Sequence, residues 1–123
     1  PRPNPGVTAW MTSADEDKLF LSVVTLAEVR YGVERMATGS RRRRYEQWLE
    51  HELPQRFEGR ILPVDPGIAD TWGRIVARCA SGGKPISVID GFLAATAEVH
   101  ALTLITRNVH HFTVLKAVFN PWT

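Results

Sequence analysis

Short apolar runs alternate along this chain with stretches of helical periodicity, and this alternation limits the possible folds more than any other feature. The runs hold branched and aromatic residues between charged or turn residues, which is typical of buried strands. We expect strands at 19–24, 61–64, 102–106 and 117–119. Strands that alternate with helices predict an α/β domain with a mostly parallel sheet.

The stretches between these runs carry apolar residues at helical spacing together with capping signals. Asp65 and Pro66 suit the cap and first position of one helix, and Ser87 suits the cap of another. We expect helices at about 5–14, at 25–38, from the arginines at 41–44 to Pro54, from Pro66 to the break at 82–85, and from Ser87 to about His100.

The size and composition of the chain indicate one soluble domain. It has 123 residues, 44% of them hydrophobic and 23% charged, and a domain of this size buries roughly two-thirds of its surface. Its single cysteine, Cys79, cannot form an internal disulfide, which excludes a secreted disulfide scaffold. No apolar run approaches the ~20 residues of a membrane span, and the first residues do not resemble a signal peptide. We therefore expect a single domain over residues 1–123, in the cytoplasm, with no membrane partner.

Arginine carries most of the positive charge. Fifteen Lys and Arg residues against thirteen Asp and Glu residues leave a net charge of +2, which is weak evidence for a nucleic-acid partner. Twelve of the fifteen cations are arginines, and four of these are consecutive: Arg41, Arg42, Arg43 and Arg44. Guanidinium groups match the geometry of phosphate. The run is either the solvated start of a helix or a contact for phosphate or an acidic partner, and the sequence leaves both interpretations open.

Three polar residues follow the predicted strands or begin a predicted helix, where α/β folds place their sites. Glu28 follows the first strand, Asp90 lies in the first turn of the helix that Ser87 caps, and Asn108 follows the strand at 102–106. Each also has a structural interpretation: Glu28 closes a capping box with Thr25, Asp90 favours a helix N-terminus, and Asn108 is a turn residue. Asp90, however, lies in an apolar stretch, where a carboxylate is costly unless it is paired or bound to a metal ion.

Other chemistries find little support. The adjacent His110 and His111 fit no standard zinc spacing, and one cysteine cannot complete a Cys/His ligand set. The chain has no glycine-rich phosphate loop and no nucleophile elbow. These absences argue against zinc, nucleotide and serine-hydrolase sites.

Four segments resemble the motifs of one toxin family, in the same order. They are residues 22–32, 83–97, 102–108 and 119–122. They resemble the VapC-type toxins, which have a PIN domain, and most of all the FitB-like branch of that family. The resemblance covers nearly the whole chain and implies a PIN-like three-layer fold, with helices on both faces of a mostly parallel sheet.

The resemblance also implies a function: the toxin component of a type II toxin–antitoxin system, a ribonuclease that depends on Mg²⁺ or Mn²⁺. By position, Glu28 and Asp90 are metal ligands, and Asn108 joins them as a catalytic residue. Possible substrate or phosphate contacts are Thr106, Arg107, Arg41, Arg42, Arg43 and Arg44. The implied partners are an RNA substrate, a cognate antitoxin, a second copy in a homodimer, and DNA indirectly through the antitoxin.

Two departures from the family pattern bear on activity. The family's opening strand carries an acid that is absent here, so we expect the chain to lack that N-terminal strand. The acid of the fourth motif occurs in the family at the position of Asn108 or of His111, and neither is acidic in this chain. Two carboxylates should bind Mg²⁺ more weakly than four. An alternative is therefore a catalytically weak module that binds its antitoxin, and DNA through it; a DNA nuclease of the same fold is less favoured because the chain is short.

Overall fold

The computed structural model describes residues 5–122, which fall into two compact units. The central unit is Leu19–Pro63. The terminal unit consists of the described parts of Pro1–Lys18 and Val64–Thr123. In both units the strands pair in parallel, which confirms the α/β class expected from the sequence.

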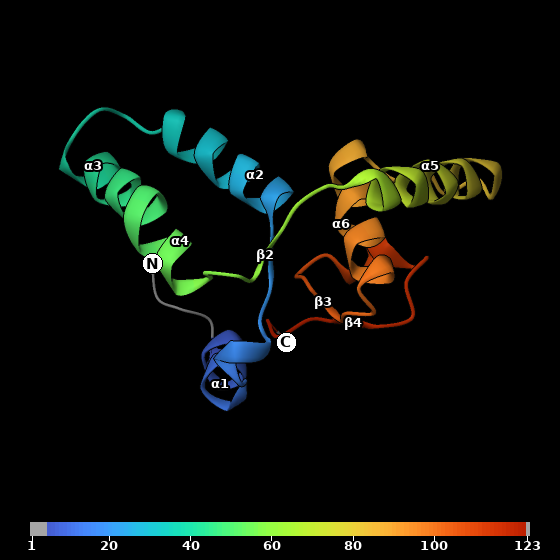
Figure 1. Cartoon of the computed structure of the whole chain (residues 1–123), viewed down its shortest axis with the longest axis horizontal. Helices are drawn as coiled ribbons and strands as arrows, with labels where there is room; N and C mark the ends of the chain where they lie inside the picture. Colours follow the sequence, from blue (N-terminus) through green and yellow to red (C-terminus); the bar gives the residue numbers. More distant parts are fainter. Residues whose placement is uncertain (1–4, 123) are drawn as a thin grey trace. The chain divides into compact units, whose positions relative to one another are not determined.

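In the central unit a run of helices lies, in chain order, between the two strands of a short parallel pair (Figure 1). β1 (Leu21–Ser22) pairs with β2 (Ile61–Leu62), with Leu21 opposite Ile61. Between them come α2 (Val23–Glu34), α3 (Ser40–Gln47) and α4 (Leu53–Arg56). Val33, Leu49 and Leu53 form the core of this unit.

Pro54 does not end the helix that begins near the arginine run, contrary to expectation. A π-helical turn, Trp48–Glu52, leads directly into α4, and the Leu53 N–H donates to the carbonyl of Trp48. A proline inside a regular α-helix removes a hydrogen bond and crowds the preceding turn. The wider π turn places Pro54 in the first turn of α4, where a missing N–H is tolerated.

The terminal unit is built around two helices that lie side by side, α5 (Pro66–Ser81) and α6 (Val88–Val99) (Figure 1). It also contains α1 (Pro5–Ser13), 3-10 turns at Glu16–Lys18 and Val109–Phe112, and the parallel strands β3 (Leu104–Ile105) and β4 (Val118–Phe119). Its core consists of Ile68, Ile75, Ala94, Ala95 and Phe112.

Two predicted caps begin α5 and α6. The Asp65 carboxylate accepts a hydrogen bond from the Ile68 N–H at 2.8 Å, and the Ser87 hydroxyl accepts one from the Asp90 N–H at 3.1 Å. These bonds satisfy backbone donors that the first helical turn leaves without a partner. The Ser87 cap fixes Asp90 in the first turn of α6.

The strands are shorter than the apolar runs predict, each covering two residues. The run at 19–24 divides at Ser22, whose hydroxyl accepts a hydrogen bond from the Val24 N–H and starts α2 two residues before the expected position. Of the helices formed by the described residues, none has the length and apolar character needed to cross a membrane.

Candidate functional site

Asp90 is the half-buried carboxylate around which the candidate site is built. It lies in the first turn of α6, where the positive end of the helix stabilises a negative charge. Its side chain is 24% exposed, and its Oδ2 lies 3.3 Å from Nδ1 of His111. The sequence predicted that a carboxylate in this apolar stretch would need a partner, and the structure supplies one.

His111 reaches Asp90 from the 3-10 turn Val109–Phe112. Its neighbour Phe112 is 2% exposed and anchors this turn in the core. The backbone N–H of His111 donates to the carbonyl of Asn108 at 3.0 Å. The His110 ring meets the His111 ring edge-on, with ring centres 4.5 Å apart. The backbone of the turn is therefore fixed, while the His111 side chain, which lies against Asp90 and the His110 ring, is 46% exposed.

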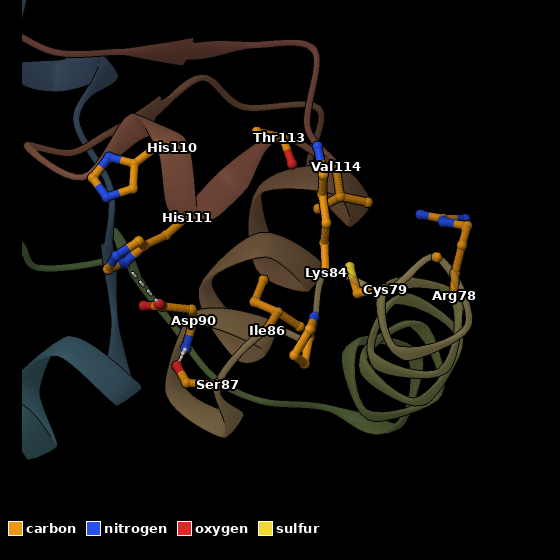
Figure 2. A pocket seen from close by; sticks show the side chains of 12 residues that line it. Arg78, Cys79, Lys84, Ile86, Ser87, Asp90, His110, His111, Thr113 and Val114 are labelled. Carbon is orange, nitrogen blue, oxygen red and sulfur yellow. Dashed lines mark hydrogen bonds and ion pairs between the residues drawn. The ribbon is translucent and has the colours of Figure 1, made fainter.

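Asp90 and His111 line an open cavity of about 700 Å³ in the terminal unit (Figure 2). Arg78 and Lys84 line the same cavity. Figure 2 shows Asp90 and His111 at one end of it and Arg78 at the other. A carboxylate beside an imidazole, with two cationic side chains along the wall, suits an anionic ligand that is bound partly through a cation.

Asn108 starts the turn that carries His111, and its side chain is exposed. Its N–H donates to the hydroxyl of Thr106 at 3.1 Å, while the Thr106 N–H donates to the Phe119 carbonyl in the strand pair. The carbonyl of Arg107 accepts a hydrogen bond from the Asn120 side chain. Backbone bonds thus set the segment 106–108, and the roles of Thr106, Arg107 and Asn108 toward a substrate stay predictions.

Glu28 lies in the central unit, on an exposed part of α2. The predicted capping box with Thr25 is wrong, because α2 begins at Val23 with Ser22 as its cap. Glu28 consequently lies in the second turn of the helix. Within residues 5–122 its side chain takes part in no hydrogen bond or ion pair. The capping explanation for Glu28 is removed, and its assignment as a metal ligand stays a prediction.

The four consecutive arginines differ in their surroundings. Arg42 forms ion pairs with Glu34 and with Glu46, the latter at 2.7 Å, and the hydrogen bond to Glu46 raises the pKa of its guanidinium group. It also donates to the carbonyl of Met36 at 3.2 Å. Arg42 therefore ties α2 to α3.

The other arginines of the run are exposed and, in the part of the chain that is described, pair with no carboxylate. Arg41 lies over the ring of Tyr45 at 5.9 Å, and Arg41, Arg44, Tyr45 and Trp48 line a shallow cavity of about 290 Å³. Cations beside aromatic rings suit nucleotides, whose phosphates and bases they can contact. The predicted contact of Arg41 and Arg44 with phosphate therefore stays a prediction that their exposed position allows.

The donor atoms at Asp90 fit a divalent metal ion only as part of a larger set. Among the described residues, no three His, Cys, Asp or Glu side chains gather into a metal-binding group. Asp90 and His111 nevertheless offer one oxygen and one nitrogen beside an open cavity, which leaves room for water or substrate oxygens. Sequence reasoning missed the contact between His111 and Asp90, although the place of His111, three residues after Asn108, coincides with an acid position of the resembled family.

Comparisons with known proteins agree with the resemblance found in the sequence. The PIN domain family matches residues 2–115. Toxin FitB of Neisseria gonorrhoeae is 39% identical over 123 residues, which cover 99% of this chain and 88% of the relative. VapC ribonuclease Y4jK of Sinorhizobium fredii is 34% identical over 121 residues, which cover 98% and 86%. A solved structure of FitAB bound to the IR36 DNA fragment matches with a TM-score of 0.94 and 37% identity, over 100% of this chain and 87% of that chain.

Proposed function

This chain belongs to the PIN domain family, and we propose that it is the toxin of a toxin–antitoxin system and cleaves RNA with the help of a divalent metal ion. The observation that carries the proposal is the half-buried Asp90 carboxylate, held beside His111 in a cavity that also presents Arg78 and Lys84. Similarity to a protein named as a toxin and to one named as a ribonuclease supports the same conclusion.

Asp90 and Glu28 are the proposed ligands of Mg²⁺ or Mn²⁺. When bound, such an ion polarises the scissile phosphate and lowers the pKa of an attacking water. Asp90 supplies a charged oxygen whose position is fixed by the Ser87 cap, since that cap sets the first turn of α6. Asn108 offers a neutral carbonyl oxygen at the end of β3.

The cationic residues are the proposed contacts for the RNA backbone. Arg107 is exposed directly after β3, and Arg41 and Arg44 present free guanidinium groups beside Tyr45 and Trp48. Arg42 is held by two glutamates, so we assign it the task of fixing α3 rather than of binding phosphate. Thr106 positions Asn108 through its hydroxyl.

The proposed partners follow the relatives. A solved structure of VapBC-5, whose title names a toxin–antitoxin system, and the DNA-bound FitAB structure support an antitoxin as the partner. We propose that the chain reaches DNA only through that antitoxin. We also propose that the chain forms a homodimer and acts in the cytoplasm.

The test is cleavage of a structured RNA with Mn²⁺ or with EDTA, by the chain and by Asp90→Asn. We expect EDTA to abolish cleavage and Asp90→Asn to slow it about 100-fold or more, because the neutral amide cannot balance the charge of the ion. Asp70→Asn is the matched control: it removes the same charge from α5 in the same unit, where Asp70 pairs, among the described residues, only with Arg74 at 2.9 Å. Equal cleavage by the wild type and Asp90→Asn would show that the activity is contamination.

A second candidate function is a module that binds its antitoxin without cleaving RNA. The favouring observation is that His111, rather than an acid, lies against Asp90. Co-purification with the antitoxin, together with no cleavage at millimolar Mn²⁺, would support this function. Failure to bind an antitoxin would count against it.

A further inference from the structure

Two cationic side chains, Arg78 and Lys84, line the cavity at Asp90 and have no assigned ligand. Figure 2 shows Asp90 at one end of this cavity and Arg78 at the other. The cavity of about 700 Å³ is in the range that takes a whole drug-sized ligand, so it is larger than a single phosphate group requires. An extended polyanion can therefore contact both ends of it.

The turn after α5 brings the two cations together. The Gly82 N–H donates to the carbonyl of Arg78 at 3.0 Å, and the Lys84 N–H donates to the carbonyl of Cys79 at 3.0 Å. Between them Gly83 has a φ of 76°, which glycine adopts without strain and which reverses the chain. Lys84 thus returns to the last turn of α5, which carries Arg78. The same bonds give partners to carbonyls whose partial negative charge would otherwise repel an anion.

Neither cation is held firmly where it is. Nη2 of Arg78 lies 3.9 Å from Oε1 of Glu98, and the two side chains are 59% and 48% exposed. This distance is longer than a hydrogen bond, and an exposed ion pair of this kind contributes little. By contrast Arg74, one turn earlier in α5, donates to Asp70 at 2.9 Å and lies outside the cavity. Lys84 is exposed and forms no ion pair within residues 5–122.

The two side chains suit phosphate in different ways. A guanidinium group offers a planar fork that matches two phosphate oxygens, and an ammonium group acts as a compact point charge. Each phosphate that such groups neutralise releases condensed counterions, so the contact favours binding and makes it depend on salt. A nucleic-acid strand carries one charge per nucleotide. It can place one phosphate at Arg78 and Lys84 while a neighbouring phosphate lies at Asp90.

We propose that Arg78 and Lys84 form a subsite for a phosphate of the RNA backbone that flanks the scissile one, and that Glu98 competes with this phosphate for Arg78. The inference rests on the proposed function in one respect, since it takes RNA as the ligand. It adds a backbone contact within the cavity of Asp90 to the proposed contacts elsewhere in the chain.

Fluorescence anisotropy with a labelled, 2′-O-methylated RNA oligonucleotide in EDTA tests the subsite without cleavage. We expect Arg78→Gln and Lys84→Gln each to weaken binding about fivefold or more at low salt, and to reduce the slope of log Kd against log salt by about one. Arg74→Gln and Lys116→Gln are the matched controls, because they remove the same charge from the terminal unit outside this cavity. If the controls reduce the slope as much as the subsite variants do, the proposal is overturned.

Glu98→Gln should have the opposite effect. It releases Arg78 from its ion pair, so we expect binding about twofold tighter or more. Asp70→Asn is the control here, since it removes the same charge beside Arg74, which does not line the cavity, and it should have a smaller effect. Equal gains from the two variants would mean that net charge alone sets the affinity, and would contradict the competition.

Two further measurements distinguish the ligand and the proposed function. An oligo-glutamate peptide that binds as tightly as the RNA, with the same dependence on Arg78 and Lys84, would assign the pair to an acidic protein and overturn the RNA contact. RNA cleavage that requires Asp90, combined with unchanged binding by Arg78→Gln and Lys84→Gln, leaves the ribonuclease standing and overturns the subsite. Binding that depends on both cations, combined with no cleavage in Mn²⁺, supports the subsite and overturns the ribonuclease.

Discussion

The cores of the two units differ in how completely they exclude water. In the terminal unit Ile68 and Ile75 are 0% exposed, and small residues of α6 allow α5 to pack closely against it. In the central unit Val33, Leu49 and Leu53 keep between 4% and 7% of their surface exposed. The largest fully enclosed side chains among the described residues, Ile68 and Ile75, therefore both lie in the terminal unit.

In the central unit, hydrogen bonds and ion pairs of two arginines add to the apolar contacts of the core. Arg42 links Glu34, Glu46 and the carbonyl of Met36, and Arg60 donates to the carbonyl of Leu19 at 2.7 Å. Asp90 and His111 belong to the terminal unit, whose core includes the fully enclosed Ile68 and Ile75. A site whose side chains must keep a fixed spacing benefits from a scaffold with little freedom.

Truncation of one core residue in each unit is the strongest way to test this comparison. Ile75→Ala should lower the free energy of unfolding by about 2–5 kcal/mol, toward the upper end, because Ile75 is fully enclosed and leaves a cavity. Leu53→Ala should cost less, since the partly exposed neighbours of Leu53 can relax around the gap. Urea denaturation followed by tryptophan fluorescence measures both. Equal losses would mean that the two cores are equally tight.

Gly91 offers a second test, at a place where α6 packs against Trp72 and Val76 of α5. A Cβ atom there would lie 2.7 Å from Nε1 of Trp72, and that nitrogen donates to the Val88 carbonyl at 3.1 Å. Gly91→Ala should therefore destabilise the chain by about 1–3 kcal/mol, although alanine is the better helix former. Thermal unfolding monitored by circular dichroism measures the loss.

Two other helical glycines are the controls for Gly91. A Cβ at Gly73 in α5, or at Gly32 in α2, would meet nothing within 4 Å. Gly73→Ala and Gly32→Ala should each be neutral or raise stability by about 0.5–1 kcal/mol. If Gly91→Ala behaved as they do, close packing of the two helices could not be what holds Asp90 in place.

Local signals predicted much of the fold. Asp65, Ser87 and the glycines after α5 mark helix ends through bonds to near neighbours, and the structure confirms these ends. Two predictions of helix ends are wrong. Ser22 rather than Thr25 caps α2, and Pro54 does not end a helix because a π turn places it in the first turn of α4. Nearby residues alone do not decide which of two capping residues is used.

The candidate site was predictable only in part, for a different reason. The apolar neighbours of Asp90 indicated that its carboxylate needs a partner. The identity of that partner depends on how the turn at Val109–Phe112 packs against α6, which is a tertiary contact between distant parts of the chain. The periodicity of either segment carries no information on that contact.

Substitutions in the arginine run should change stability least, and they test whether the ion pairs of Arg42 stabilise the central unit. Arg42→Ala should lower the melting temperature slightly, whereas Arg43→Ala should leave it unchanged, because Arg43 is exposed and Arg42 bridges α2 and α3. The two ion pairs of Arg42 are partly exposed, so the difference between the variants should shrink in about 1 M salt, where the screening length is about 3 Å. A difference that salt leaves unchanged would instead assign the link between α2 and α3 to the hydrogen bond that Arg42 donates to the carbonyl of Met36. In that case the central unit would rely on backbone capping rather than on charge, and its contrast with the terminal unit would lie in apolar burial alone.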